Sequence, residues 1–333
     1  MKKINLAFLG ATMIAFLTLT TGCKKDKKDT AVTTTANAKP NDQQGSTEAD
    51  AVISDVNDFI SNKMGGGSNM KVGAYNLPCG VVSVDSSTND GSGHKIYKFQ
   101  YGNQTACGYK KKSGQVSFAL TNATAFNTAG ATFTLTFTDY VVEVVATGSI
   151  VTLNGTITIV NQTGYYIWEP VSDNTKTVTH KVRGAFTVKY SDNTERTRNY
   201  YQLRTWANSK ANNDWTGISL TIAGDSINGS HTYYEIGKTY EGNYDYQSEM
   251  LTNFVWSNCG TTWAGPYLLK QGHARMNVTV PLISPAYIDV EGGYHWDYSN
   301  ATATPTLVND CSTNAYKITT VITTATTTQY QLY

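Results

Sequence analysis

The chain has 333 residues, with 26 Lys and Arg against 25 Asp and Glu, and a formal net charge of +1. Six of the lysines lie within the first 28 residues, so the rest of the chain carries a slight excess of acidic side chains. This balance predicts no basic stripe of the kind that binds polyanions, and it excludes nucleic acid as an expected partner.

The N-terminal segment predicts export. Lys2 and Lys3 precede an apolar run from Leu6 to Leu17, which is shorter than the roughly 18–20 residues that a membrane-spanning helix needs. The following Leu19-Thr20-Thr21-Gly22-Cys23 resembles the bacterial lipobox. The resemblance implies that residues 1–22 form a lipoprotein signal peptide and that Cys23 becomes an acylated N-terminus. Three acyl chains exceed what stable membrane attachment requires.

Residues 23–46 predict a flexible tether between the lipid and the folded body. They begin with the charged run Lys24–Asp29 and continue with a stretch rich in Thr, Ala, Asn and Gln. Such a segment has too little apolar surface to order itself. The lysines suit either contact with anionic lipid head groups or simple solvation.

One amphipathic helix is expected over residues 47–64. Its apolar residues recur at three- and four-residue spacing and form one stripe: Ala51, Val52, Val56, Phe59 and Ile60. Ser46 or Thr47 is expected to cap its start, with Glu48 and Asp50 favoured by the positive end of the helix dipole, and Gly65–Gly67 to end it.

From about residue 70 the hydrophobic period changes to two. Alternating segments such as Tyr97–Tyr101, Val116–Leu120 and Phe133–Phe137 predict antiparallel strands with one apolar face. Turns are expected at Asn154-Gly155, between two halves of a hairpin, at Ser191–Thr194 and at Asn228-Gly229. The sequence therefore predicts an all-β body of antiparallel sheets. This body is either one extended sheet or two sandwich-like modules, over residues 70–175 and 176–333.

Four cysteines follow Cys23, and their even number in an exported chain predicts two disulfides. Three pairings are open. In two stretches of similar layout a cysteine precedes a pair of β segments and a second cysteine follows them, which favours Cys79–Cys107 and Cys259–Cys311. With no Cys-x-x-Cys motif and no Cys/His cluster, neither a metal site nor a cofactor is expected.

These stretches also resemble uncharacterised Bacteroidota-type lipoproteins. The resemblance rests on short motifs: Tyr97–Gly102 before Cys107, Lys110–Val116, Phe137–Tyr140, Leu153–Thr156, Arg196–Arg198 before Trp206, Cys259–Trp263 and Asp310-Cys311. It covers most of residues 79–333, although the family's final Asp-Tyr-Gly is replaced here by Trp296–Ser299. The resemblance implies a β-rich fold and a location in the cell envelope, and it implies no activity.

No catalytic residues are assigned. The five histidines (His94, His180, His231, His273 and His295) show no metal-ligand spacing, and strand-edge or surface positions are the expectation for them. Gly91-Ser92-Gly93-His94 is interpreted as a turn rather than a nucleophile elbow. Glu241, Asp245 and Glu249 are acids near aromatic residues, and a glycosidase pair among such acids is an open alternative.

Aromatic residues are the most suggestive feature. Tyr201, Trp206, Trp215, Tyr294 and Trp296 are candidates for stacking on a ligand, because exposed Tyr and Trp offer flat amphipathic surface. Packing of the same side chains across strands is the competing interpretation. Four arginines on the expected hairpin (Arg183, Arg196, Arg198 and Arg204) are interpreted as a solvated face that pairs with Asp192 or Glu195, with an anion site as the alternative.

These observations predict a lipid-anchored outer-membrane protein that faces the periplasm or the cell surface. Its expected role is non-catalytic, either binding a glycan or an envelope protein or contributing structure. A hydrolase acting on glycans or peptides and a scaffold without a ligand are the alternatives.

Overall fold

The computed structural model describes residues 44–63, 77–86, 95–107, 110–123, 125–145, 147–262, 266–297 and 304–332. The expected signal peptide, Cys23, most of the tether and the glycine run after the helix lie outside the described residues. Lipid attachment therefore stays a prediction.

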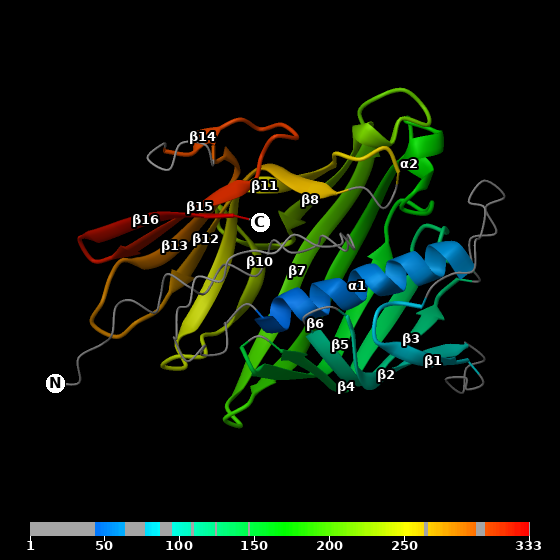
Figure 1. The fold of residues 1–333 in the computed structure, drawn as a ribbon, viewed down its shortest axis with the longest axis horizontal. Helices are drawn as coiled ribbons and strands as arrows, with labels where there is room; N and C mark the ends of the chain where they lie inside the picture. Colours follow the sequence, from blue (N-terminus) through cyan, green and yellow to red (C-terminus); the bar gives the residue numbers. More distant parts are fainter. Residues whose placement is uncertain are drawn as a thin grey trace.

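One antiparallel sheet dominates the molecule (Figure 1). Its strands are β1 (Val81–Asp85), β2 (Ile96–Cys107), β3 (Lys110–Thr121), β4 (Thr132–Val144), β5 (Ser149–Asn161), β6 (Thr177–Tyr190), β7 (Glu195–Asn208), β8 (Ile218–Gly224), β9 (Ser226–Asn228), β10 (His231–Lys238), β11 (Asp245–Asn258), β12 (Tyr267–Val278), β13 (Ala286–His295), β14 (Thr306–Leu307), β15 (Ala315–Ile322) and β16 (Ala325–Leu332). Among the described residues, one 20-residue helix, α1 (Gln44–Lys63), accompanies them, together with the short α2 (Glu169–Ser172) and the 3-10 helix η3 (Trp215–Gly217).

The strands follow one another across the sheet almost in chain order. The path runs from β1 to β7 and continues through β10, β11, β12, β13, β15 and β16, while β8 pairs with both β7 and β11. Between β5 and β6 the pairing is continuous from Val151↔Tyr190 to Asn161↔His180. The all-β prediction is confirmed in its extended-sheet form. The proposed boundary near residue 175 coincides with no break in the sheet, because β6 continues the ladder.

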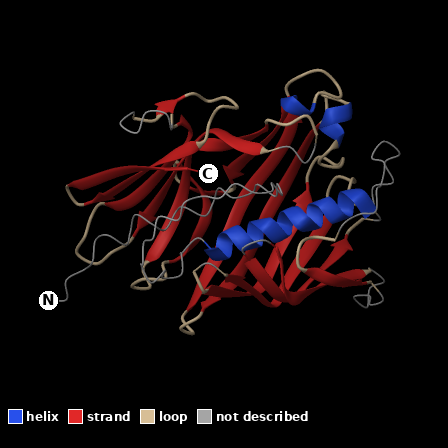
Figure 2. Ribbon diagram, in the orientation of Figure 1, coloured by secondary structure: helices blue, strands red, loops and turns tan. Residues whose placement is uncertain are grey.

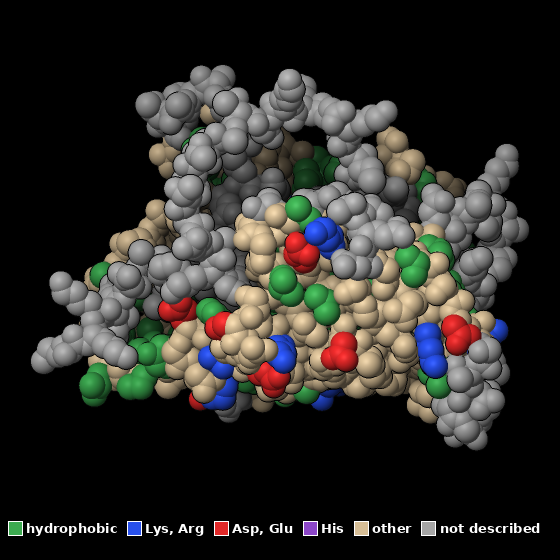
Figure 3. Space-filling model, turned by 60° about the horizontal axis from the view of Figure 1, so that its bottom comes forward, with side chains coloured by type: hydrophobic (Ala, Val, Ile, Leu, Met, Phe, Trp, Pro, Cys, Tyr) green, Lys and Arg blue, Asp and Glu red, His purple; other side chains and the backbone are tan. Residues whose placement is uncertain are grey.

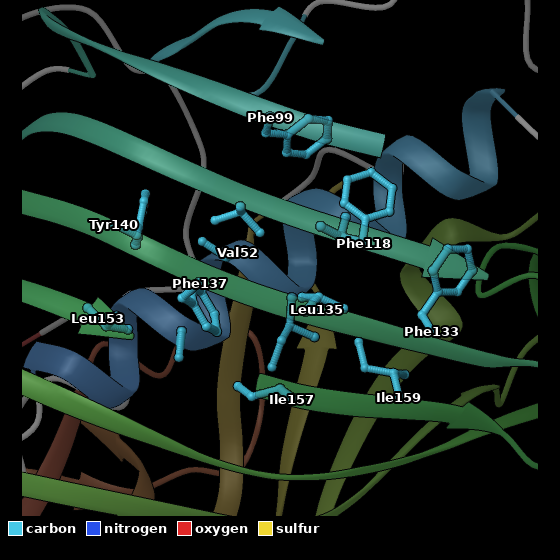
Figure 4. Packing of buried hydrophobic residues seen from close by; sticks show 14 of the residues in the cluster. Val52, Phe99, Phe118, Phe133, Leu135, Phe137, Tyr140, Leu153, Ile157 and Ile159 are labelled. Atoms are coloured by element: carbon cyan, nitrogen blue, oxygen red, sulfur yellow. The ribbon is translucent and has the colours of Figure 1, made fainter. Parts of the chain in front are cut away.

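The buried apolar side chains form two groups along this sheet. The first joins α1 to β1–β7, and the second lies mainly on β8 and β10–β15. Figure 4 shows Val52 of α1 over the strands that present Phe99, Phe118 and Leu135. Near the other end of α1, Phe59 packs edge-on against Phe99, with 5.2 Å between ring centroids. The apolar stripe expected of the helix is therefore the face that binds it to the sheet.

Helix α1 lies across one face of the curved sheet (Figures 1 and 2), and this face is called the inner face below. The helix begins at Gln44, three residues before the expected start. Ser46 and Thr47 thus lie inside the helix, and the expected capping role is wrong for both.

Figure 3 shows a different view, in which uncharged side chains and backbone predominate and charged groups are scattered.

The expected hairpin turn at Asn154-Gly155 is wrong, because β5 runs straight through it. Asn154 Oδ1 accepts a hydrogen bond from the backbone N–H of Asp139 at 2.8 Å, where β4 has a register irregularity. Gly155 has a φ of +133°, and a Cβ at this position would lie 2.6 Å from the carbonyl oxygen of Ala185. Asn154 thus stabilises the irregularity in β4, and Gly155 allows β6 to approach closely. Bulges and close strand approaches use the same residue types as a tight turn. Turns do occur at Ser191–Thr194 and after Asn228.

Candidate functional site

A buried polar cluster lies between the first half of α1 and the inner face of the sheet. It consists of Ser46 and Asp50 from α1, Arg198, Tyr200, Gln202 and Arg204 from β7, Glu235 from β10 and Tyr246 from β11, all buried. Alternate residues of a strand share one face. The four β7 members therefore point together at the helix, while the i, i+4 spacing places Ser46 and Asp50 together on α1.

An ion pair joins the helix to β7 at one end of the cluster. Arg204 Nη2 lies 2.5 Å from Asp50 Oδ1, and both side chains are almost completely buried. Gln202 Oε1 accepts hydrogen bonds from Arg204 Nε at 3.0 Å and from Nη2 at 2.7 Å. Burial raises the pKa of Asp50, and the neighbouring Arg204 opposes this rise. The guanidinium is thereby held in place by one partner from the helix and one from its own strand.

Glu235 is the second acidic centre of the cluster. Its Oε1 accepts a hydrogen bond from Ser46 Oγ at 3.0 Å and another from the Tyr246 hydroxyl. Arg198 donates to the same tyrosine oxygen and to the carbonyl oxygen of Lys238 at 2.9 Å. Burial raises the pKa of Glu235, whereas Arg198 and these hydrogen bonds lower it. Glu235 of β10 is thus connected to α1 through Ser46 and to β11 through Tyr246. Tyr246 in turn accepts a hydrogen bond from Arg198 of β7.

The backbone of α1 is also recognised directly. The Tyr200 hydroxyl donates a hydrogen bond of 2.7 Å to the carbonyl oxygen of Ser46. Glu48 pairs with Lys110 of β3 at 2.7 Å, and Gln44 Oε1 accepts a hydrogen bond of 2.6 Å from Ser149 of β5. Glu48 and Asp50 therefore bind cationic side chains of the sheet, where the sequence suggested only an interaction with the helix dipole.

The arginines of β6 and β7 divide between the two faces of the sheet. The expected solvated face is wrong for Arg198 and Arg204, which are 0% and 3% exposed. On the outer face Arg183 Nε lies 2.6 Å from Asp225, and at the end of β7 Arg196 donates to the carbonyl oxygens of Thr239 and Tyr240. The two expected partners are engaged in other ways: Asp192 accepts a hydrogen bond from the Tyr240 hydroxyl, and the backbone carbonyl oxygen of Glu195 accepts one from Arg196.

His180 lies beside the polar cluster on β6 and takes no part in its hydrogen bonds. Its ring is buried between Phe126 and Trp206, with ring centroids 5.0 and 4.9 Å away, and neither ring nitrogen has a hydrogen-bond partner. Burial, with Arg204 nearby, lowers its pKa to about 3. His180 is therefore a neutral core side chain.

This environment predicts a specific pH effect. The folded pKa lies below the unfolded value near 6.5, so the unfolded chain binds the proton first and stability falls as pH decreases below 6.5. Between pH 6.5 and pH 5, wild type should lose about 2 kcal/mol of unfolding free energy relative to His180→Phe. Urea unfolding of both proteins at the two pH values measures this difference. Equal pH slopes for the two proteins would contradict it.

Asp55 of α1 has the opposite effect on the pH dependence of stability, which is why the comparison must be made between wild type and a variant. Burial, with Glu48 adding to it, raises the pKa of Asp55 to about 6, although Lys112 opposes the rise. A raised carboxyl pKa means that the folded chain keeps its proton longer, so stability falls as pH increases from about 4 to 6. The two slopes offset one another in wild type, but the His180→Phe comparison leaves the Asp55 contribution unchanged.

The expected stacking residues do not share one surface. Trp206 is 6% exposed on the inner face, so the expectation of a free aromatic surface is wrong for it. Tyr201, on the same strand, points to the outer face beside Arg183. Trp215 lies in η3, and Tyr294 and Trp296 lie at the end of β13, where Tyr294 packs against Tyr330. Tyr201, Trp215, Tyr294 and Trp296 are partly exposed.

The acids and histidines of the outer face pair across strands. Glu249 lies 2.7 Å from His231, and Asp245 lies 2.8 Å from Lys238. Arg275 forms two hydrogen bonds to Asp289, of 2.7 and 2.8 Å. Burial opposes ionisation of Asp289, yet the hydrogen bonds from Arg275 and the nearby His273, 3.5 Å away, hold its pKa below the usual value. This arrangement is a set of cross-strand ion pairs, in which Glu249, Asp245 and Asp289 each have a basic partner.

The Cys259–Cys311 pairing is confirmed, with the two Cα atoms 5.7 Å apart. Cys79 is disulfide-bonded as well. The side chain of Cys107 lies outside the described residues, so its pairing with Cys79 stays a prediction. The chain near Cys79 does run beside β2, since the N–H of Gly102 donates to the carbonyl oxygen of Gly80 at 3.0 Å.

Sequence reasoning missed the polar cluster as a site. The available signal was the alternation Arg198, Tyr200, Gln202, Arg204 on one strand, together with Ser46 and Asp50 one helical turn apart. Each pattern by itself indicates a solvated face. Only their mutual contact changes the interpretation, because polar groups on both elements satisfy one another out of water.

Comparison with known proteins gives no relative: no family model, no curated protein and no solved structure matches this chain. Among the described residues, no group of His, Cys, Asp and Glu is arranged to hold a metal ion. None of the described helices combines the length and the apolar character needed to cross a bilayer.

Proposed function

We propose that this chain is a lipid-anchored outer-membrane protein with a non-catalytic role, in which the sheet is a rigid body held close to the membrane. In this proposal Cys23 carries the lipid, the tether leads to α1, and α1 connects the anchor to the sheet. The partner is an envelope protein or a glycan, bound on the surfaces that α1 leaves open.

The observation that carries the proposal is the way α1 is held. The first helix after the tether is fixed by Asp50–Arg204, by Glu48–Lys110 and by the hydrogen bonds to Ser46. An ordinary amphipathic helix needs only its apolar stripe for docking. Buried ion pairs add little net stability but penalise any other position of the helix. This supports a defined connection between anchor and body.

The placement of the acids supports a non-catalytic role. Within the cluster, burial raises the pKa of Asp50 and of Glu235, and both side chains are enclosed between α1 and the sheet. A general acid or base must reach the proton that it transfers. The acids Asp245, Glu249 and Asp289 of the outer face are engaged by basic partners. A hydrolase directed at glycans or peptides is the competing candidate.

The anchor is tested by Cys23→Ser. We expect labelled fatty acid to be incorporated into wild type and lost in the variant, which leaves the membrane fraction, because the acyl chains supply the attachment. Cys259→Ser, which removes a cysteine outside the signal segment, is the matched control and should stay in the membrane. If the Cys23→Ser variant stayed in the membrane fraction as fully as wild type, lipid attachment at Cys23 would be contradicted.

The role is tested with lipid-modified protein in detergent, immobilised and incubated with outer-membrane proteins, peptidoglycan and surface polysaccharide. We expect one fraction to be retained without chemical change. Tyr201→Ala and Trp296→Ala, on separated surfaces, should show which surface binds, because aromatic contacts carry a large share of such binding. Depolymerised glycan would favour the hydrolase, and no retention of any fraction would favour a scaffold without a ligand.

A further inference from the structure

The two ends of the sheet differ in how well they accept another strand. The sheet path ends at β1 on one side and at β16 on the other. An end strand presents a row of backbone N–H and C=O groups that another chain can pair with, and proteins usually protect such edges. The described residues show such protection at one edge only.

At the β1 edge the strand is short and irregular. It has five residues, its pairing with β2 shifts between Val81 and Ser83, and it ends with the charged Asp85. A bulge, a short length and a charge each discourage edge pairing. The β1 edge therefore carries the devices that keep a sheet from extending.

At the β16 edge none of these devices is present. The strand Ala-Thr-Thr-Thr-Gln-Tyr-Gln-Leu pairs with β15 in unbroken register from Ile322↔Ala325 to Ala315↔Leu332. It contains no charged residue and no proline. Residues 325–328 are exposed. A long, regular, uncharged edge is the kind that pairs with a further strand.

We propose that β16 pairs in antiparallel fashion with β16 of a second copy of this chain, so that the two sheets continue into each other about a two-fold axis. When a strand pairs with its own copy about a two-fold axis, a charge at the axis faces the same charge directly, and charges near the axis lie close to their copies. The threonines of β16 avoid this repulsion. They also suit cross-strand Thr–Thr contacts.

The difference between the two edges explains why the partner is β16 and not β1. Pairing of β16 with the β1 of another copy is head-to-tail and would continue into a filament. Pairing of β16 with β16 uses the same surface twice and closes as a dimer. One strand pair buries less than a standard interface, so we expect a weak dimer that forms at high local concentration.

Cysteine scanning of the full-length chain in membranes tests this pairing. Thr326→Cys, Thr327→Cys and Thr328→Cys are oxidised and run on non-reducing gels beside the parent chain. Residues opposite one another across an antiparallel pair lie within disulfide reach. We expect dimer yield to peak at one of the three positions. Val82→Cys, on the β1 edge, is the matched control and should give only the parent's background.

A charge test uses the same readout. Adding Thr326→Lys to the best cysteine variant places like charges at the paired edge and should reduce the dimer several-fold, whereas adding Ser83→Lys should leave it unchanged. Circular dichroism of the lysine variants should match the parent. A dimer that survives Thr326→Lys, a yield no higher than that of Val82→Cys, or mixed dimers between Val82→Cys and Thr328→Cys chains would overturn the proposal.

Discussion

Arg204→Leu should lower the free energy of unfolding by about 3–5 kcal/mol, because it leaves Asp50 buried without its cationic partner. The substitution also removes the two hydrogen bonds that Arg204 donates to Gln202 Oε1, so this amide oxygen loses both donors. Asp50 must take up a proton or remain charged in a buried site without its cation, and both cost free energy. Chemical denaturation at pH 7, followed by circular dichroism, measures the loss.

A double-mutant cycle separates the net contribution of the ion pair to stability from the cost of leaving one buried charge unpaired. Asp50→Leu/Arg204→Leu should recover much of the loss, since replacing both partners removes the unpaired buried charge. Lys238→Ala is the matched control: its pair with Asp245 is exposed, and we expect a change within about 1 kcal/mol. If Arg204→Leu is as mild as this control, the Asp50–Arg204 pair does not fix α1.

Removing the Cys259–Cys311 bridge by Cys259→Ser/Cys311→Ser should lower the free energy of unfolding by about 2–4 kcal/mol. The bridge closes 52 residues that include β12, β13 and β14. Without it the unfolded chain gains conformational freedom over this whole segment, while the strand pairing of the folded state stays the same. Thermal unfolding of oxidised wild type and the double variant measures the effect.

Reduction provides the internal control for this prediction. A reductant should lower the melting temperature of wild type at least as far as the double variant, because Cys79 is disulfide-bonded as well. In the double variant the reductant should then have a smaller effect than in wild type. A double variant as stable as oxidised wild type would mean that the strand ladders alone hold residues 259–311.

Local patterns of the sequence predict many of the elements and fewer of the contacts. The apolar stripe of α1 and the alternation of the strands are properties of neighbouring residues, so both are readable. Asn154-Gly155 is a counterexample: the pair is typical of a tight turn, yet Gly155 lies inside β5 because β6 approaches it closely. A local signal is overruled here by strands that the local window does not contain.

Strand β7 shows most clearly what the tertiary structure decides. Its inner face carries Arg198, Gln202 and Arg204, and its outer face carries Tyr201 and Leu203, the reverse of the usual arrangement. Period two indicates which residues share a face but cannot tell which face is covered. The expected stacking of Trp206 and the expected solvation of Arg204 are both wrong for this one reason.

Local periodicity was enough to predict the all-β class and the position of helix α1, and a repeated local layout was enough to favour the Cys259–Cys311 pair. Only the tertiary structure decided that the sheet is continuous and that the polar side of α1 is buried. Asp50 and Arg204 are 154 positions apart, and a buried charge is tolerated only where an opposite charge meets it. That meeting depends on how the sheet curves around α1, which no local pattern encodes.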